Sequence, residues 1–166
     1  MGEMANVYLG LGSNKGDRLE NMRSALKLLA PFLEIHKVSR VYESVPMYKE
    51  DQDLFLNAAL HGRTELSPQD LLVRVKEVEK ALGRQEGERN GPREIDIDIL
   101  LYDDLVHQTD DLTIPHPKMH ERLFVMVPLE EIASIVSHPV HGRLVIEMRE
   151  DLGPLGDTLW EIQERL

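Results

Sequence analysis

The chain contains 166 residues, and its 30 Asp and Glu against 19 Lys and Arg give a formal net charge of −11. A chain this acidic repels the phosphate backbone of nucleic acid, and its apolar runs fall short of the ~20 residues that cross a bilayer, so we expect neither a nucleic-acid nor a membrane partner. The length suits a single domain, residues 1–166, and the N-terminus lacks the basic and apolar pattern of a secretory signal, which favours the cytoplasm.

Signals for strands and helices alternate through the first part of the chain. Val7, Leu9 and Leu11 alternate with other residues as they do in a strand. Asp17, followed three residues later by Glu20, forms the capping box that opens a helix. The predicted elements are a strand at 7–11, a helix at 17–30, strands at 35–42 and 54–63, a helix at 67–83 and a strand at 94–102. This order predicts an α+β fold of the ferredoxin-like βαββαβ class, with helices packed on an antiparallel sheet.

The remainder of the chain is expected to form a C-terminal extension. Residues 112–117 are bounded by proline and are predicted to be extended. Residues 124–132 predict a short helix that Pro128 breaks, since proline removes a helical hydrogen bond. Thr158 with Glu161 has the spacing of a capping box, which predicts a last amphipathic helix.

The strand at 94–102 carries two aspartates, Asp96 and Asp98. Residues two apart in a strand point to the same face, roughly 6.6 Å from each other, so the two carboxylates lie side by side. Close carboxylates repel each other, and Mg²⁺, which binds one or two carboxylates together with substrate phosphates, relieves that repulsion. The simpler interpretation is a polar face turned to solvent. Because Asp is depleted in strands, its double use here favours a metal site.

Arginines gather around this strand in an otherwise acidic chain. Arg84, Arg89 and Arg93 lie in the segment before it, and Arg122 follows it. Guanidinium groups bind phosphate oxygens bidentately, so arginines near an Asp pair indicate a triphosphate held jointly by metal and arginine. For Arg84 and Arg89, pairing with neighbouring glutamates on a solvated loop is an equally good explanation.

His116 and His120 have the four-residue spacing of two metal ligands on a helix. Pro115 and Pro117 flank His116 and argue against a regular helix there. We therefore interpret His116 as a contact to phosphate or another ligand, with a plain surface histidine as the alternative.

Gly10, Gly12 and Gly16 follow a predicted strand and precede a predicted helix. The third glycine stands one residue too far along for a dinucleotide-binding fingerprint, and the chain contains no Gly-Lys-Ser or Gly-Lys-Thr of a Walker A loop. A tight turn from strand to helix explains these glycines best, and its backbone N–H groups could still contact a ligand.

A series of short motifs resembles one known enzyme family. In chain order they are Tyr8-Leu9-Gly10-Leu11-Gly12-Ser13-Asn14, Phe55-Leu56-Asn57-Ala58-Ala59, Gly91-Pro92-Arg93-Glu94-Ile95-Asp96-Ile97-Asp98-Ile99-Leu100, Ile114-Pro115-His116-Pro117, Met119 and Arg122. Together they resemble the hydroxymethyldihydropterin pyrophosphokinases over about residues 7–132, and the Gly-Pro-Arg-x-Ile-Asp-x-Asp run is highly specific.

The resemblance implies two substrates, ATP and 6-hydroxymethyl-7,8-dihydropterin, and two Mg²⁺ ions as the cofactor. It implies that Asp96 and Asp98 hold both ions and, with Arg84 and Arg93, form the catalytic set. The residues implied to contact ATP are Glu79, Arg84, Arg93, His116 and Arg122. The residues implied to line the pterin pocket are Ser44, Val45, Met47, Phe55, Asn57 and Phe124. A monomer is the expected state.

The activity implied is pyrophosphoryl transfer from ATP to the pterin hydroxymethyl group, with release of AMP, in folate synthesis. Three alternatives stay open on the residues alone. One is a kinase that transfers only the γ-phosphoryl group, another is a non-enzymatic ferredoxin-like binding module, and a distant third is a Rossmann oxidoreductase. The released nucleotide distinguishes the first from pyrophosphoryl transfer, and any ATP turnover excludes the second.

Overall fold

The structure is a computed structural model of the whole chain, and residues 3–46, 53–83 and 94–166 are described. The helices are α1 (Arg18–Leu29), α2 (Pro68–Ala81), α3 (Leu123–Ala133), α4 (Val145–Asp151) and a 3-10 turn, η1 (Met119–Glu121). The strands are β1 (Ala5–Ser13), β2 (Glu34–Val38), β3 (Tyr42–Ser44), β4 (Phe55–Thr64), β5 (Asp96–Tyr102), β6 (His107–Gln108), β7 (Thr113–Ile114) and β8 (Leu159–Glu161). In the described part of the chain, no helix is long and apolar enough to cross a membrane.

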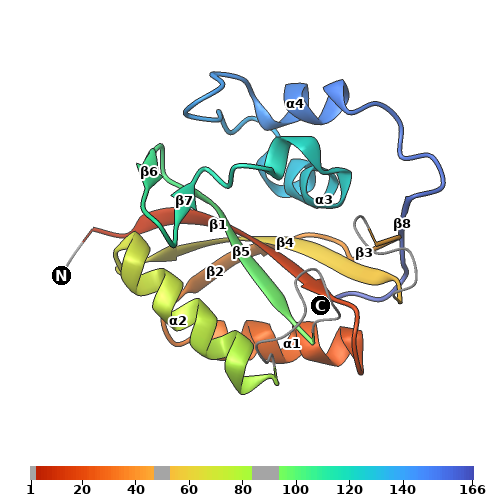
Figure 1. Cartoon of the computed structure of the whole chain (residues 1–166), viewed down its shortest axis with the longest axis horizontal. Coiled ribbons are helices and arrows are strands. Elements are labelled where there is room, and N and C mark those ends of the chain that lie inside the picture. The colour runs from red at the N-terminus through yellow and green to blue at the C-terminus, as the bar shows by residue number, and fades with distance from the viewer. Residues whose placement is uncertain (1–2, 47–52, 84–93) are drawn as a thin grey trace.

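The main sheet has the order β5-β1-β4-β3-β8, and β2 pairs with β4 beside β3. Every pairing in it is antiparallel, and β1 lies in the centre between β4 and β5 (Figure 1). As expected, α1 follows β1, α2 follows β4, and β5 follows α2, so the prediction of a ferredoxin-like α+β fold with an antiparallel sheet is confirmed.

Helices cover both faces of this sheet (Figure 1). On one face, α1 and α2 pack against a core that includes Val7, Leu9 and Leu11 of β1. On the other face, α3 and α4 pack over Tyr8 of β1 and Ala59 of β4. Alternation along β1 therefore assigns its side chains to one or the other of two separate cores.

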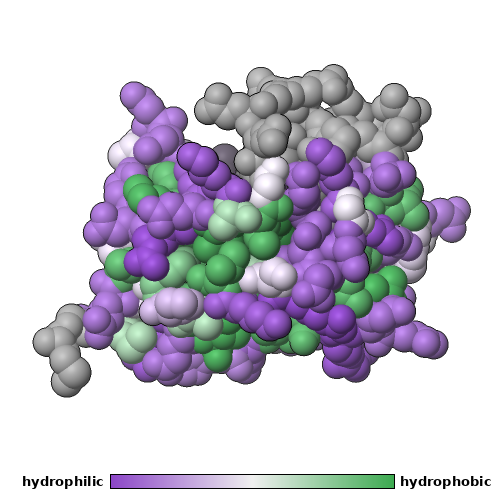
Figure 2. Space-filling model, turned by 90° about the horizontal axis from the view of Figure 1, so that it is seen from below, coloured by the Kyte–Doolittle hydropathy of each residue, from purple (hydrophilic) through white to green (hydrophobic). Residues whose placement is uncertain are grey.

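The outer surface of the α1 and α2 layer is mostly hydrophilic, with apolar side chains gathered near its middle (Figure 2).

The two N-terminal helix caps form as the sequence predicts. The carboxylate of Asp17 accepts a 3.2 Å hydrogen bond from the backbone N–H of Glu20. The hydroxyl of Ser67 accepts the same kind of bond from Asp70, also at 3.2 Å, directly before Pro68 opens α2.

Several expectations about local structure are wrong. The single strand predicted at 35–42 is two short strands, β2 and β3. Pro128 lies inside α3 without breaking it, because buried Val125, Met126 and Leu129 hold that helix against the sheet. The segment from Thr158 to Glu161 is not a capped helix. It contains β8, because the open edge of β3 offers backbone hydrogen bonds that a single helical turn cannot match.

Candidate active site

The strand register places the Asp pair and Asn57 on one face of the sheet. Gly12 of β1 pairs with Asp96 on one side and with Asn57 on the other. Gly10 likewise pairs with Asp98. Paired residues in an antiparallel sheet project to the same side, so these side chains converge on the face that α3 covers. The expectation that Asp96 and Asp98 share a face is confirmed.

Gly12 keeps the space between these groups free of a side chain. A Cβ atom at this position would stand 3.7 Å from Cδ1 of Phe55 and 3.9 Å from Oδ1 of Asn57. Phe55 itself is half-buried at the start of β4. The glycine therefore lets a flat ligand approach the sheet beside Phe55 and Asn57.

Hydrogen bonds to β3 orient the side chain of Asn57, which is 4% exposed. Its Nδ2 donates to the hydroxyl of Ser44 at 2.8 Å and to the backbone carbonyl of Tyr42 at 3.3 Å. Both amide hydrogens are directed at β3, and the carbonyl oxygen lies on the side of Gly12. Asn57 therefore presents an acceptor to the space above Gly12, which suits the amino and N–H donors of a pterin ring.

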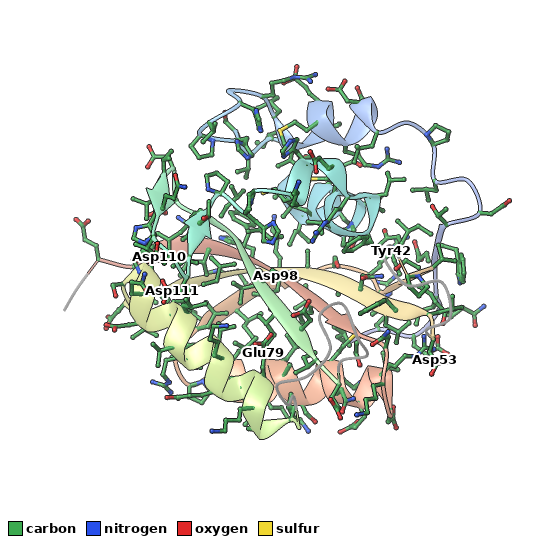
Figure 3. All side chains as sticks on the ribbon, in the orientation of Figure 1. Tyr42, Asp53, Glu79, Asp98, Asp110 and Asp111 are labelled. Carbon is green, nitrogen blue, oxygen red and sulfur yellow. The ribbon has the colours of Figure 1, made fainter. Side chains whose placement is uncertain are left out.

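A pocket of about 330 Å³ adjoins the Asp pair at the edge of β5. Its described lining comes from α2, β5 and the β6–β7 segment, and it contains the carboxylates of Glu79, Asp96, Asp98, Asp110 and Asp111 against the single Lys76. Asp98 lies on β5 and Glu79 between β5 and α2, whereas Asp110 and Asp111 lie by the β6–β7 turn (Figure 3). So many carboxylates repel a triphosphate unless cations neutralise them. The pocket thus fits a nucleotide that arrives with divalent metal.

Lys76, Asp110 and Asp111 were missed by reasoning from the sequence. Asp111 belongs to a small network in which Gln69 of α2 donates to Thr109 at 3.0 Å and to Asp111 at 3.2 Å. Thr109 also donates to Asp111, at 2.9 Å. Hydrogen bonds from Gln69 and Thr109 lower the pKa of Asp111 below its usual value. No local motif marks these residues, since only the packing of the β6–β7 turn against α2 brings them to the pocket.

His116 lies at the edge of the same pocket and is neutral at physiological pH. Burial, followed by the positive charge of Arg122, lowers its pKa to about 4, although Asp96 acts in the opposite direction. Its Nδ1 accepts a 3.1 Å hydrogen bond from the backbone N–H of Lys118. A neutral ring whose Nδ1 is an acceptor carries its hydrogen on Nε2, so His116 offers one N–H donor of the kind that phosphate oxygens accept. The structure thus brings His116, Arg122 and Asp96 close together.

Phe124 lies in the first turn of α3, on the helix that covers this face of the sheet. The guanidinium of Arg122 stands 5.7 Å from the centre of its ring. Arg122 therefore connects the phenyl ring of Phe124 to the group around His116.

The carboxylate of Glu79 is buried, with 4% of the residue exposed. Its Oε2 accepts a 2.8 Å hydrogen bond from the backbone N–H of Ile97, the residue between Asp96 and Asp98. The family resemblance implied that Glu79 contacts ATP. In the structure it lines the pocket and also fixes the backbone that carries both aspartates.

Four further residues were expected at the site, and the structure describes only one of them, Val45. Val45 directly follows β3 and is 40% exposed, and its N–H donates to the carbonyl of Thr158 at 3.1 Å. Met47, Arg84 and Arg93 lie outside the residues that the structure describes.

Asp96 and Asp98 fit a magnesium site that is completed by substrate. Among the residues described, no group of three or more acidic or histidine side chains is arranged to hold a metal ion. Mg²⁺ is commonly held by one or two carboxylates plus phosphate oxygens, and two carboxylates on one face beside a nucleotide-sized pocket meet that requirement.

Taken together, the fold and this face describe a ferredoxin-like domain with an acidic pocket beside the Asp pair and with Asn57 across Gly12 from Asp96. Comparisons with known proteins narrow this class. The model of the 7,8-dihydro-6-hydroxymethylpterin-pyrophosphokinase family matches residues 8–134. The chain belongs to this family.

Individual relatives agree with this assignment. The chain is 49% identical to the 2-amino-4-hydroxy-6-hydroxymethyldihydropteridine pyrophosphokinase of Aquifex aeolicus, over 89% of this chain and 92% of that protein. It is 45% identical to the enzyme of the same name from Bacillus subtilis, over 80% of this chain and 81% of that protein. It is 46% identical to a mitochondrial folate synthesis bifunctional protein of Pisum sativum, but it spans only 25% of that longer protein.

A solved structure shows the same fold. The HPPK-DHPS triple mutant of Plasmodium falciparum, crystallised with pteroate, aligns with a TM-score of 0.77 at 16% identity. The alignment covers 96% of this chain and 47% of that one. The chain therefore spans about half the length of this structural relative.

Proposed function

We propose that this chain transfers the pyrophosphoryl group of ATP to the hydroxymethyl group of 6-hydroxymethyl-7,8-dihydropterin, releasing AMP, as a step of folate synthesis. Family membership supports the reaction, and the observation that carries the proposal is the placement of Asp96 and Asn57 on either side of Gly12. A donor held at the aspartates and a ring held at Asn57 would meet above this glycine. Such placement accounts for much of the catalysis of phosphoryl transfer.

In this proposal the acceptor hydroxyl of the pterin attacks the β-phosphorus of ATP. A new oxygen–phosphorus bond forms as the bond to the oxygen between the α- and β-phosphorus breaks. That oxygen leaves with AMP, and the proton of the acceptor hydroxyl passes to solvent or to a phosphate oxygen. Asp96 and Asp98 would hold two Mg²⁺ ions, which would supply charge neutralisation on the phosphates. His116 donates its Nε2–H to a phosphate oxygen, and Arg122 adds a positive charge beside it.

Asn57 accepts hydrogen bonds from the pterin edge, and the ring lies against Phe124 and Phe55. Aromatic side chains bind flat rings by stacking, and the absence of a side chain at Gly12 leaves room for such a ring. Ser44, Val45 and Met47 contribute to the wall of the pterin pocket. Arg84 and Arg93 contact the triphosphate. Arg93 is supported by its place in the Gly-Pro-Arg motif before β5, and Arg84 by the resemblance to the family alone.

We further propose a single domain over residues 1–166 that acts as a monomer in the cytoplasm. Sedimentation velocity at low and high protein concentration tests the monomer directly, since a dimer would sediment faster as the concentration rises.

One incubation tests the reaction. The protein is mixed with ATP, Mg²⁺ and 6-hydroxymethyl-7,8-dihydropterin, and AMP is separated from ADP. AMP that forms only when the pterin is present is the expected result. ADP would instead identify a γ-phosphoryl kinase, and a folded protein that neither binds ATP with Mg²⁺ nor turns it over would be a binding module.

A further inference from the structure

The C-terminal strand β8 lies directly beside the strand that orients Asn57. β3 has only three residues, and β8 pairs with all of them on the side opposite β4. Glu43 pairs with Trp160, and Ser44 pairs with Leu159. The chain passes from α4 around the outside of the molecule to reach this edge (Figure 1). β8 lies beyond residues 8–134, which the family model matches.

A shift of β3 would change the orientation of the Asn57 amide. Two atoms of β3, the Ser44 hydroxyl and the Tyr42 carbonyl, accept both of its N–H groups. A strand of three residues has few backbone hydrogen bonds of its own to fix it, so its position depends on the strands beside it. Whatever fixes β3 therefore also fixes the acceptor that Asn57 presents.

Glu43, between Tyr42 and Ser44, joins β3 to two distant parts of the chain. Its Oε1 accepts a 3.0 Å hydrogen bond from the indole Nε1 of Trp160. Its Oε2 accepts a 2.8 Å bond from Arg18 at the start of α1. The same Nη1 of Arg18 donates to the backbone carbonyl of Leu54 at 2.8 Å, directly before β4. Hydrogen bonds to a charged carboxylate are stronger than those between neutral groups.

We propose that Trp160 is a positioning residue for the pterin site, which acts through Glu43 on β3 and thereby on Asn57. The inference rests on the proposed function, because the ring bound beside Asn57 is the pterin. Trp160 is 37% exposed and does not belong to either buried core. Its indole N–H group, on the other hand, has a charged and largely covered acceptor, as the Glu43 side chain is 18% exposed.

The test compares three full-length variants with the wild type. Trp160→Phe keeps an aromatic side chain on β8 and removes the N–H donor. Glu43→Gln removes the charge that both donors use. Glu161→Gln is the matched control, because it weakens the other side-chain anchor of β8, the 3.1 Å ion pair with Arg40, and leaves Trp160 and Glu43 in place. Dissociation constants for the pterin and for ATP with Mg²⁺ are measured by separate titrations, together with the thermal midpoint.

We expect Trp160→Phe and Glu43→Gln to weaken pterin binding by about three- to tenfold, the size of one ordinary net hydrogen bond, because the effect reaches the pterin only through β3 and Asn57. ATP affinity should stay within about twofold of the wild type, and Glu161→Gln should change neither constant. Unchanged pterin affinity in both test variants would overturn the inference. So would an equal loss of pterin and ATP affinity that follows a lower thermal midpoint, since that pattern marks a purely structural role. Failure of the wild type itself to bind the pterin would count against the proposed function instead.

Discussion

The amide nitrogen of Asn57 donates a 2.8 Å hydrogen bond to the hydroxyl of Ser44. Ser44→Ala removes this acceptor and leaves the amide with the Tyr42 carbonyl alone. We expect the pterin dissociation constant to rise about three- to tenfold with ATP affinity unchanged, because a net hydrogen bond contributes about 1 kcal/mol. Isothermal titration with each ligand measures both constants. Ser137→Ala, at an exposed position, is the control. Equal losses for the two ligands would contradict a role confined to the pterin side.

Gly12→Val fills the space between Asn57 and the Asp pair. A Cβ atom alone would meet its nearest neighbours at ordinary contact distances, 3.7 Å and longer, so Gly12→Ala should fold and retain part of its activity. The two further methyl groups of valine occupy the proposed ring position. Because they exclude the ring, turnover should fall at least about tenfold below that of the alanine variant. The measurements are steady-state AMP formation and circular dichroism. A valine variant as active as the alanine variant would place the ring elsewhere.

Removal of either carboxylate of the pair should abolish most turnover without unfolding the chain. For Asp96→Ala and Asp98→Ala we expect a loss of at least about two orders of magnitude in kcat, since each change removes a ligand for the cations that neutralise the phosphates. Asp104→Ala, at an exposed position just beyond β5, is the control and should retain normal turnover. Near-normal turnover in either pair variant would exclude the proposed two-metal site.

The sequence predicted the part of this site that depends on periodicity. Alternation in the strand at 94–102 was enough to place Asp96 and Asp98 side by side, because the side-chain period of a strand holds wherever the strand forms. The family motifs added Asn57 and His116, and the structure places them around the same aspartates.

Contacts between distant segments could not be predicted in this way. Asp111 reaches the pocket only because the β6–β7 turn packs against α2, and no spacing along the chain records that contact. Thr158 and Glu161 have the spacing of a helix cap, but pairing with the free edge of β3 outweighs that local preference. Such competition is decided by tertiary hydrogen bonds and not by the local sequence.

Two histidines, the buried His138 and the half-buried His116, should make the fold sensitive to acid. The pKa of His116 and that of His138 are both lowered from 6.5 to about 4, chiefly by burial. Between about pH 6.5 and pH 4 these two histidines are protonated in the unfolded chain but remain neutral in the folded chain. The free energy of unfolding should therefore decrease as the pH falls from 6.5 to 4 and should be independent of these groups above that range. Urea unfolding at a series of pH values measures the slope.

His138 is 3% exposed, and its Nδ1 accepts hydrogen bonds from the N–H groups of Val140 and His141. His138→Gln removes one of the two titrating rings, so the loss of stability between pH 6.5 and 4 should become shallower even if the variant is less stable throughout. An unchanged slope in His138→Gln would show that this ring is protonated equally well in the folded chain.

Substitutions of Glu79 separate its contact with the backbone from a contact with nucleotide. Its carboxylate accepts the N–H of Ile97, so it holds the segment between the two aspartates at a fixed distance from α2. Glu79→Gln keeps an acceptor for that N–H, whereas Glu79→Ala leaves the buried donor without it. We expect the alanine variant to lose about 1–3 kcal/mol of stability and more turnover than the glutamine variant, because a buried unsatisfied donor is costly and the Asp pair is displaced.

The comparison needs three measurements on each variant: urea unfolding, the ATP dissociation constant and kcat. If Glu79 acts by positioning β5, the glutamine variant should resemble the wild type in stability and in ATP affinity. If its charge instead contacts the nucleoside, both variants should lose ATP affinity to the same extent while Glu79→Gln remains fully stable. The second result would support the contact with ATP that the family resemblance implied and would place the nucleoside against α2.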